Sequence, residues 1–254
     1  MLKELAHRVG SGFLRNTIRR KRVTCLVCTS PLDLERPFTT CFTCKEAARE
    51  ARRCDTRTAD LVVPLVYAIK GGQSAHLMRT YKTAVGTPAG TEQLTLLLHT
   101  GFAFHRVCIE SAAEQRLTAW STVPSTRRPD RVHPMRNIAS TVLGDVDGLR
   151  EVTLLPGPAF AQSPRKFVEG MWRVEGSCHG AHVLLIDDTW TTGANVQSAA
   201  AALRAAGAAR VTVLVLARWL DPAWSPTQKF MRQLLVADYD ITHCPVAGDW
   251  SCVN

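Results

Sequence analysis

The residues best suited to chemistry form one segment, in which two carboxylates and two threonines follow an apolar run. Residues 183–186 are apolar throughout, which is typical of a strand buried on both faces. Asp187 and Asp188 end this strand, and an alanine-rich helix follows after Thr189, Trp190, Thr191, Thr192 and Gly193. The first N–H groups of a helix bind phosphate, threonine hydroxyls add donors, and two carboxylates accept hydrogen bonds from ribose hydroxyls. The segment therefore predicts a site for a phosphorylated sugar.

Gly193 and the absence of lysine from the turn limit the kind of phosphate site that the segment can form. Gly193 lets the backbone approach a ligand closely. No lysine stands in the turn, so it is not a Walker A loop, which requires G-x-x-x-x-G-K-[ST]. The competing interpretation is an ordinary polar loop that carries a solvated acidic pair.

Two C-x2-C hooks form a second chemical feature: Cys25 with Cys28, and Cys41 with Cys44. Each hook supplies two thiolates about one turn apart, which suits tetrahedral Zn²⁺. The surrounding segment has few apolar residues, and a metal would supply the stability that a core cannot. We predict a closed structural zinc site rather than a catalytic one, with four inert thiols as the alternative. Cys54 could compete as a ligand.

The tail contains further metal-ligating side chains, namely His243, Cys244 and Cys252. They could form or complete a second metal site, and ordinary buried thiols are the simpler interpretation.

Composition limits the class of protein without choosing a ligand. The chain has 254 residues, 46% of them hydrophobic, a net charge of +9 and a pI of about 9.3. A basic surface suits phosphorylated ligands, nucleic acid or anionic membranes. No stretch approaches the ~20 apolar residues of a membrane span, and the N-terminus lacks the apolar core of a signal peptide. Nine cysteines without an export signal favour reduced thiols in the cytoplasm.

Alternating strands and helices must position these residues. Apolar runs predict strands over residues 61–69, 120–124, 152–155, 183–186 and 211–216, and periodicity predicts helices over 74–83, 92–116, 132–143 and from 194 to a cap at Gly207. Core-facing side chains are expected at Leu94, Leu97, Leu98, Phe102 and Val107. This order predicts an α/β fold with a doubly wound, mostly parallel sheet, whose ligands lie at the carboxyl ends of the strands.

The two ends of the chain are expected to be simpler. Residues 1–22 predict a short amphipathic helix that packs on the zinc module, and the tail from Asp221 is less regular. The predicted domains are residues 1–57 (helix and zinc finger), 58–220 (the α/β domain) and 221–254 (the tail).

A lysine and two glycines, Lys70, Gly71 and Gly72, follow the first strand. Glycines at a strand end can bring backbone N–H groups near an anion. An ordinary loop turn is the equal alternative.

The acidic segment resembles the phosphoribosyl-pyrophosphate (PRPP) motif of type I phosphoribosyltransferases, in which an apolar strand, two acidic residues and a Thr-Thr-Gly turn follow one another. Over residues 23–219, the order of zinc hooks, strand-Lys-Gly-Gly, Val-Pro-Ser loop and PRPP motif resembles the ComF-like group. This group includes competence protein F and amidophosphoribosyltransferase-like proteins, and is linked to DNA uptake in competent bacteria.

The resemblance implies a role for each motif residue. Asp187 and Asp188 would bind the ribose hydroxyls, residues 189–193 the 5′-phosphate, and residues 70–72 the pyrophosphate. Mg²⁺ would bind mainly to pyrophosphate and ribose oxygens. The chain departs from the family where residues 127–134 replace its Arg-Gly-Phe-Asn-Gln loop, where Asn195 replaces a frequent threonine, and where Trp190 is bulky. The acceptor and the catalytic residues are therefore unassigned.

Two functions follow as hypotheses. The first is an enzyme that transfers the phosphoribosyl group from PRPP to a nitrogen acceptor and releases pyrophosphate. The second is a non-catalytic accessory protein that binds single-stranded DNA through basic residues of its N-terminal third, such as Arg19, Arg20, Lys21, Arg49, Arg52 and Arg53.

Overall fold

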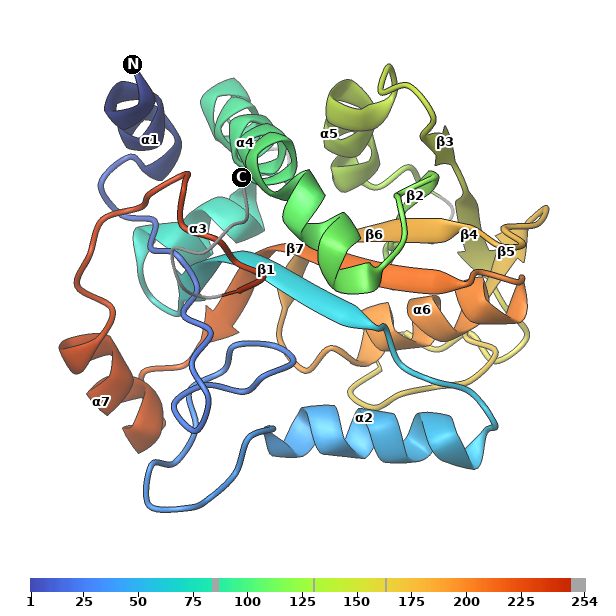
Figure 1. Ribbon diagram of the computed structural model, residues 1–254, viewed down its shortest axis with the longest axis horizontal. Coiled ribbons are helices and arrows are strands. Elements are labelled where there is room, and N and C mark those ends of the chain that lie inside the picture. Colours follow the sequence, from blue (N-terminus) through green and yellow to red (C-terminus); the bar gives the residue numbers. More distant parts are fainter. Residues whose placement is uncertain (84–86, 130, 163, 248–254) are drawn as a thin grey trace.

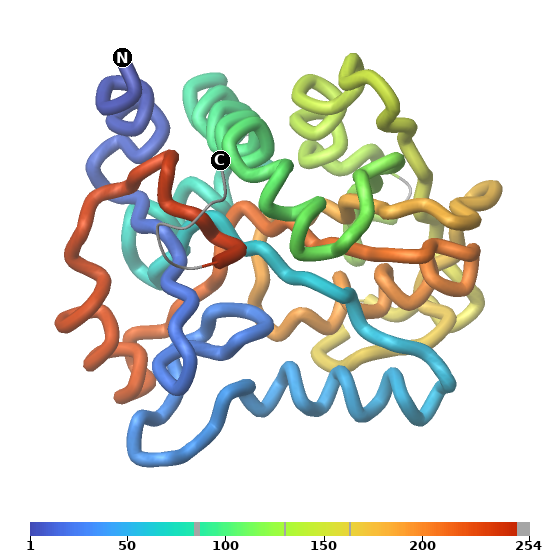
Figure 2. Tube along the Cα trace, viewed as in Figure 1, coloured from blue at the N-terminus to red at the C-terminus, as the bar shows by residue number. Residues whose placement is uncertain are grey.

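The computed structural model describes residues 1–83, 87–129, 131–162 and 164–247 (Figures 1 and 2). Its helices are α1 (Leu2–Gly10), α2 (Phe42–Arg53), α3 (Gln73–Thr80), α4 (Pro88–Ala113), α5 (Pro134–Leu143), α6 (Ala194–Ala205) and α7 (Ser225–Gln233). Its strands are β1 (Leu61–Ile69), β2 (Ala119–Thr122), β3 (Arg150–Glu151), β4 (Thr153–Pro156), β5 (Trp172–Glu175), β6 (His182–Trp190) and β7 (Arg210–Leu220).

Five strands form one parallel sheet in the order β1-β7-β6-β2-β3, and β4 and β5 form a separate antiparallel pair. Alternate residues of β6 enter opposite cores, because side chains alternate along a strand. Leu184 and Ile186 join one hydrophobic cluster, whereas Val183 and Leu185 join the other. The central strand is thus buried on both faces, as its apolar sequence predicts.

Helices cover both faces of the sheet. In Figure 1, α4 and α5 lie on one side of the sheet, whereas α6 and α2 lie on the other. Residues of α3, α4 and α5 pack in one cluster with the sheet, and α6 packs in the other. The fold is therefore α/β with a doubly wound, mostly parallel sheet, as the sequence predicts.

The direction of the connections reverses between β6 and β2. The chain leaves β6 through α6 toward β7, and leaves β2 through α5 toward β3, on the opposite face and in the opposite direction. At such a reversal, the loops that follow the two strands separate and leave room for a ligand outside the carboxyl ends. The turn at 191–193 and the loop at 123–133 border this position.

The prediction for residues 1–22 is wrong in length and in packing. Helix α1 ends at Gly10, since Ser11 (φ 46°) and Gly12 (φ 74°) adopt the left-handed conformation. The next residues run along the edge of β1, where the Tyr67 N–H donates to the Arg15 carbonyl at 2.9 Å. Helix α1 itself packs on α4 rather than on the zinc module, because Val9 belongs to the cluster that α4 lines.

Three other expectations also need correction. Val107 is 63% exposed, because the buried stripe of α4 continues through His105 and Ile109 instead. Strand β5 was not predicted, because two of its four residues, Arg173 and Glu175, are charged and exposed; it is held by pairing with β4. Helix α7 in the tail was not predicted either, and its Phe230 packs edge-to-face against Tyr67 of β1.

The two C-x2-C pairs pack against the main domain. Cys25, Cys28 and Cys44 share one hydrophobic cluster with residues of β6, β7 and α6. Among the described residues, no helix is both long enough and apolar enough to cross a membrane.

Candidate functional site

The acidic segment forms the end of β6 and a tight turn into α6. Gly193 is the N-cap of α6 and has φ +80°, which L side chains rarely adopt. A Cβ at this position would lie 2.2 Å from the Trp190 ring. Glycine is therefore required twice, by the backbone conformation and by the packing of this indole ring.

A buried arginine holds the turn from behind. Arg218 of β7 is 7% exposed, and its Nη1 donates to the carbonyls of Trp190 (2.7 Å) and Thr191 (2.9 Å). These two carbonyl oxygens of the turn are therefore already hydrogen-bonded within the protein. The first N–H groups of α6 have no partner within the helix and lie at the carboxyl edge of the sheet.

Asp188 is buried and is held by residues from elsewhere in the chain. Its Oδ2 accepts hydrogen bonds from the Tyr81 hydroxyl and the Lys82 ammonium, both at 2.6 Å. Burial alone would raise the pKa of Asp188, but Lys82, His133 and these hydrogen bonds outweigh it and hold that pKa below its ordinary value. Asp188 is thus a carboxylate at neutral pH.

Asp187 has the opposite electrostatic character. Burial, followed by the negative charge of Asp188, raises the pKa of Asp187 to about 8. Its Oδ1 accepts a hydrogen bond from the Asp188 N–H at 2.9 Å. The pair therefore combines one fixed carboxylate with one carboxyl group that exchanges a proton near neutral pH, a division typical of acid–base and ligand-binding sites.

His133 completes the surroundings of the acidic pair. Its Nδ1 accepts a hydrogen bond from the Met135 N–H at 3.1 Å, so the proton of the neutral ring is on Nε2, which lies 3.8 Å from Asp188 Oδ2. Burial lowers the pKa of His133, despite the nearby carboxylate. A neutral imidazole N–H from the loop after β2 consequently lies beside Asp188.

The residues predicted for PRPP occupy different environments. Thr191 is exposed at the turn, and Thr192 is partly buried with its hydroxyl 3.3 Å from the Ala194 N–H. Thr189 lies within β6 and is partly buried. The ring of Trp190 is 1% exposed within the core, so only its backbone is available to a ligand.

The predicted pyrophosphate segment lies at the same edge of the sheet but two strands away, which corresponds to about 10 Å between β1 and β6. Gly71 has φ +85°, as expected for a tight turn, and the Gly72 N–H is used by the Ile69 carbonyl at 2.9 Å. The Lys70 ammonium pairs with Asp221 at 2.7 Å. A bound anion would have to compete with that carboxylate, and the pyrophosphate role stays a prediction.

Four residues of the site were not predicted from the sequence: Tyr81, Lys82, His133 and Arg218. Arg218 had a local signal, since it is a charged residue inside the otherwise apolar run of β7. The other three carried no such signal, because an aromatic-basic pair after a helix and a histidine before a proline are common in surface loops.

The four cysteines of the hooks do converge. Their sulfur atoms all lie within 4.8 Å of one another, a donor set that could hold a structural metal such as Zn²⁺. Cys41 is the N-cap of α2, and its N–H lies 3.3 Å from the Cys25 sulfur. The positive end of the helix dipole therefore faces the sulfur cluster and favours thiolates.

The thiols of this cluster have unequal proton affinities. Hydrogen bonds from the neighbouring thiols, that of Cys25 foremost, lower the pKa of Cys41. The hydrogen bond with Cys28 brings the pKa of Cys25 to about 7. Burial raises the pKa of Cys28, and the hydrogen bond with Cys25 raises that of Cys44. Thiolate is thus available at neutral pH for a metal to bind.

Three of the six basic residues proposed to contact DNA form side-chain interactions within the protein. Arg19 donates to the Leu26, Val62 and Pro245 carbonyls and lies between buried elements. On α2, Arg49 pairs with Glu46 at 2.5 Å, and Arg53 pairs with Glu50 at 3.1 Å. The basic face of α2 is therefore partly neutralised by its own carboxylates.

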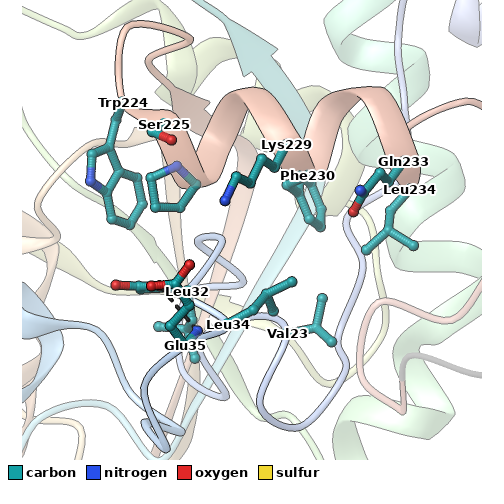
Figure 3. Close-up of a pocket in the computed structure, with 12 residues that line it drawn as sticks. Val23, Leu32, Leu34, Glu35, Trp224, Ser225, Lys229, Phe230, Gln233 and Leu234 are labelled. Atoms are coloured by element: carbon teal, nitrogen blue, oxygen red, sulfur yellow. Dashed lines mark hydrogen bonds between the residues drawn. The ribbon is translucent and has the colours of Figure 1, made fainter.

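A separate cavity of about 350 Å³ lies between the segment from Leu32 to Glu35 and helix α7 (Figure 3). Trp224, Lys229 and Phe230 point from the helix toward this segment. None of the residues that line this cavity belongs to the PRPP motif.

No protein-family model matches this chain, and no curated protein matches it. Among solved structures, adenine phosphoribosyltransferase from Leishmania tarentolae is similar with 15% identity and a TM-score of 0.33, over 58% of this chain and 65% of that one. A purine phosphoribosyltransferase from Pyrococcus horikoshii has 16% identity and a TM-score of 0.28, over 50% of this chain and 87% of that one. Phosphoribosylpyrophosphate synthetase from Mycobacterium smegmatis has 16% identity and a TM-score of 0.33, over 70% of this chain and 60% of that one.

This chain spans less than two thirds of the Leishmania enzyme and of the synthetase. TM-scores below 0.5 carry no conclusion about its activity, which has to be inferred from its own site.

Proposed function

We propose that this chain binds PRPP with Mg²⁺ at the turn between β6 and α6 and transfers its phosphoribosyl group to a nitrogen acceptor. One observation carries the proposal: two carboxyl groups, two threonine hydroxyls and a helix N-terminus meet at the carboxyl ends of β6 and β2, where the topology reverses. Donors for a phosphate lie at the turn, and acceptors for sugar hydroxyls precede it.

The roles of the acidic pair follow from their environments. Asp188 is held as a carboxylate by Lys82 and accepts one ribose hydroxyl. Asp187 accepts the other hydroxyl after losing its proton, which its pKa of about 8 allows near neutral pH. Mg²⁺ would lie on the pyrophosphate and ribose oxygens, where oxygen donors suit it, and its chemistry is to stabilise charge on the departing pyrophosphate.

The reaction is a displacement at C1 of the ribose. The nitrogen of the acceptor forms a bond to C1, the bond from C1 to pyrophosphate breaks, and the nitrogen then loses a proton. In this proposal the protein acts by positioning both reactants and by stabilising the charge that develops. Asp187, whose pKa of about 8 favours the protonated form more than that of an ordinary aspartate, would receive that proton once it is ionised.

Titration calorimetry with PRPP and MgCl₂ tests the proposal. Thr192→Val removes a hydroxyl donor at the turn and is expected to weaken binding by about 1–3 kcal/mol, which corresponds to roughly 5- to 150-fold in Kd. Thr141→Val, at an exposed position of α5, is the matched control, because the Thr141 hydroxyl donates to the Asn137 carbonyl of its own helix. Absence of PRPP binding by folded wild type would overturn the proposal. Binding without pyrophosphate release, in a screen of nitrogen acceptors, would leave a sensor instead of an enzyme.

We also propose that the Cys25, Cys28, Cys41 and Cys44 cluster holds one structural Zn²⁺. Four sulfurs within 4.8 Å and the helix N-terminus at Cys41 support this assignment. The accessory role in DNA uptake that the ComF-like resemblance implies stays a prediction, and three of the six basic side chains named for it, Arg19, Arg49 and Arg53, already interact within the protein.

A further inference from the structure

Three metal-ligating side chains meet at a second place in the fold. His105 and Cys108 lie on α4, and Cys244 lies in the tail. One ligand atom from each lies within 4.8 Å of the other two. His105 is 4% exposed and Cys244 is fully buried. Residues three apart on a helix project from the same face, so α4 presents an imidazole and a thiol side by side to the tail.

The hydrogen bonds around these residues orient the histidine ring and the tail. His105 Nε2 lies 3.1 Å from the Ile241 carbonyl oxygen, which can only accept. Nε2 therefore donates its proton to this carbonyl. Metal-binding histidines commonly donate their other N–H to a carbonyl in this way. The Ala247 N–H also points at the Cys244 sulfur, at 3.4 Å, as a donor to a thiolate would.

We propose that His105, Cys108 and Cys244 bind a second structural zinc ion, which fastens the tail to α4. Two thiolates and one imidazole form a soft donor set that favours Zn²⁺ over Mg²⁺ or Ca²⁺. Three protein ligands leave one tetrahedral position for a further ligand. Of the residues that the sequence suggested for a second site, Cys244 takes part. His243 instead places its Nε2 2.9 Å from the Thr17 carbonyl, and Cys252 lies outside the described residues.

The path of the tail gives this metal a physical role. After α7 the chain returns beside the N-terminal segment (Figure 2), where Asn16 exchanges two hydrogen bonds with Asp240. The described part of the tail beyond α7 contains no helix or strand. Arg19 Nε also donates to the Pro245 carbonyl at 3.2 Å, next to Cys244 in the chain. A metal adds stability that a short irregular segment lacks.

Metal analysis of the full chain, purified under reducing conditions with zinc present, tests the proposal. The wild type is expected to hold two zinc ions per chain. Cys244→Ser and Cys108→Ser should each lower this to one, whereas Cys54→Ser, the control cysteine outside both clusters, should leave two. Circular dichroism confirms that each variant is folded. Retention of the wild-type zinc content by folded Cys244→Ser would overturn the proposal.

Further variants distinguish zinc bound at the four-cysteine cluster from zinc bound at His105, Cys108 and Cys244. Cys41→Ser should also lose one zinc, and the double variant Cys41→Ser/Cys244→Ser should lose both. Even if neither variant folds, wild type with a single zinc per folded chain contradicts the proposal. A disulfide between Cys108 and Cys244 in the reduced preparation, detected by mass spectrometry, contradicts it as well. Trypsin should cleave the tail at Arg232 faster after zinc is removed by a chelator, and equal rates would argue against the tail-fastening role.

Discussion

Replacing Asp187 by asparagine is expected to stabilise the unliganded protein at neutral and alkaline pH while weakening its binding of PRPP. The carboxyl group is partly buried and adjoins the Asp188 carboxylate, so ionisation of Asp187 is unfavourable in the folded state. Asparagine has almost the same shape and carries no charge. Its side-chain oxygen can still accept the 2.9 Å hydrogen bond from the Asp188 N–H.

The direction of the stability change with pH follows from the difference in the pKa of Asp187 between the folded and the unfolded protein. Folding raises the pKa of Asp187 from 3.8 to about 8, so the folded protein holds this proton more tightly than the unfolded chain. The stabilisation is fully present below pH 3.8 and is lost as the pH rises to about 8. At about 1.36 kcal/mol for each pH unit, the whole interval corresponds to at most about 6 kcal/mol. Since Asp187 is only partly buried and solvent screens its charge, we expect about 2–4 kcal/mol of this in practice.

Urea unfolding of wild type and Asp187→Asn, measured at intervals from pH 4 to pH 9, is the appropriate assay. The stability advantage of the variant should grow between pH 4 and pH 8 and then level off. Asp221→Asn is a control of opposite sign, because the hydrogen bond with Lys70 lowers the pKa of this surface carboxylate. Its small loss of stability should appear above the ordinary pKa of aspartate and vanish in acid. A pH-independent difference for Asp187→Asn, or a less stable variant at pH 8, would refute the reasoning.

The remaining predictions concern the turn, the acidic pair, the metal and nucleic acid. Gly193→Ala should cost roughly 2–4 kcal/mol of stability, because it combines a left-handed backbone with a clash against Trp190; chemical denaturation measures it, and an unchanged midpoint would contradict it. Lys82→Met should lose about 1–2 kcal/mol at pH 7, an effect that shrinks as the pH falls through the lowered pKa of Asp188; a loss that stays constant throughout an acid titration would argue against the ion pair. Chelation of zinc should expose the Cys41 thiol to a thiol reagent, whereas equal reactivity before and after would exclude metal binding there. Any affinity for single-stranded DNA should fall steeply with salt in fluorescence anisotropy, and neutralising the basic residues of α2 should flatten that slope.

Features written in neighbouring residues could be predicted from the sequence. The alternation of apolar runs with 3.6-residue periodicity predicts the parallel α/β sheet, because each strand and helix records its own burial in local spacing. The turn from Asp187 to Gly193 and the pairs of cysteines are likewise recognisable, since their chemistry depends on residues that adjoin one another. Predictions failed at positions whose state depends on remote packing, such as exposed Val107 and the early end of α1 at Gly10.

The protonation state of the acidic pair was decided only by the tertiary structure. Lys82 reaches Asp188 across 106 positions of the chain, and His133 approaches the same oxygen from the loop after β2. Without these partners, two adjacent aspartates would be equivalent in the sequence. The fold separates them, because Asp188 gains a cation and a hydroxyl while Asp187 gains burial and a negative neighbour.

The second sulfur cluster shows the same limit. Cys244 attracts notice in the sequence only through its neighbours His243 and Cys252, whereas the fold places it beside His105 and Cys108 of α4. Spacing along a chain reports which residues share a face of one element, but ligand geometry depends on distances between elements. Those distances are set by how the sheet, the helices and the returning tail pack together.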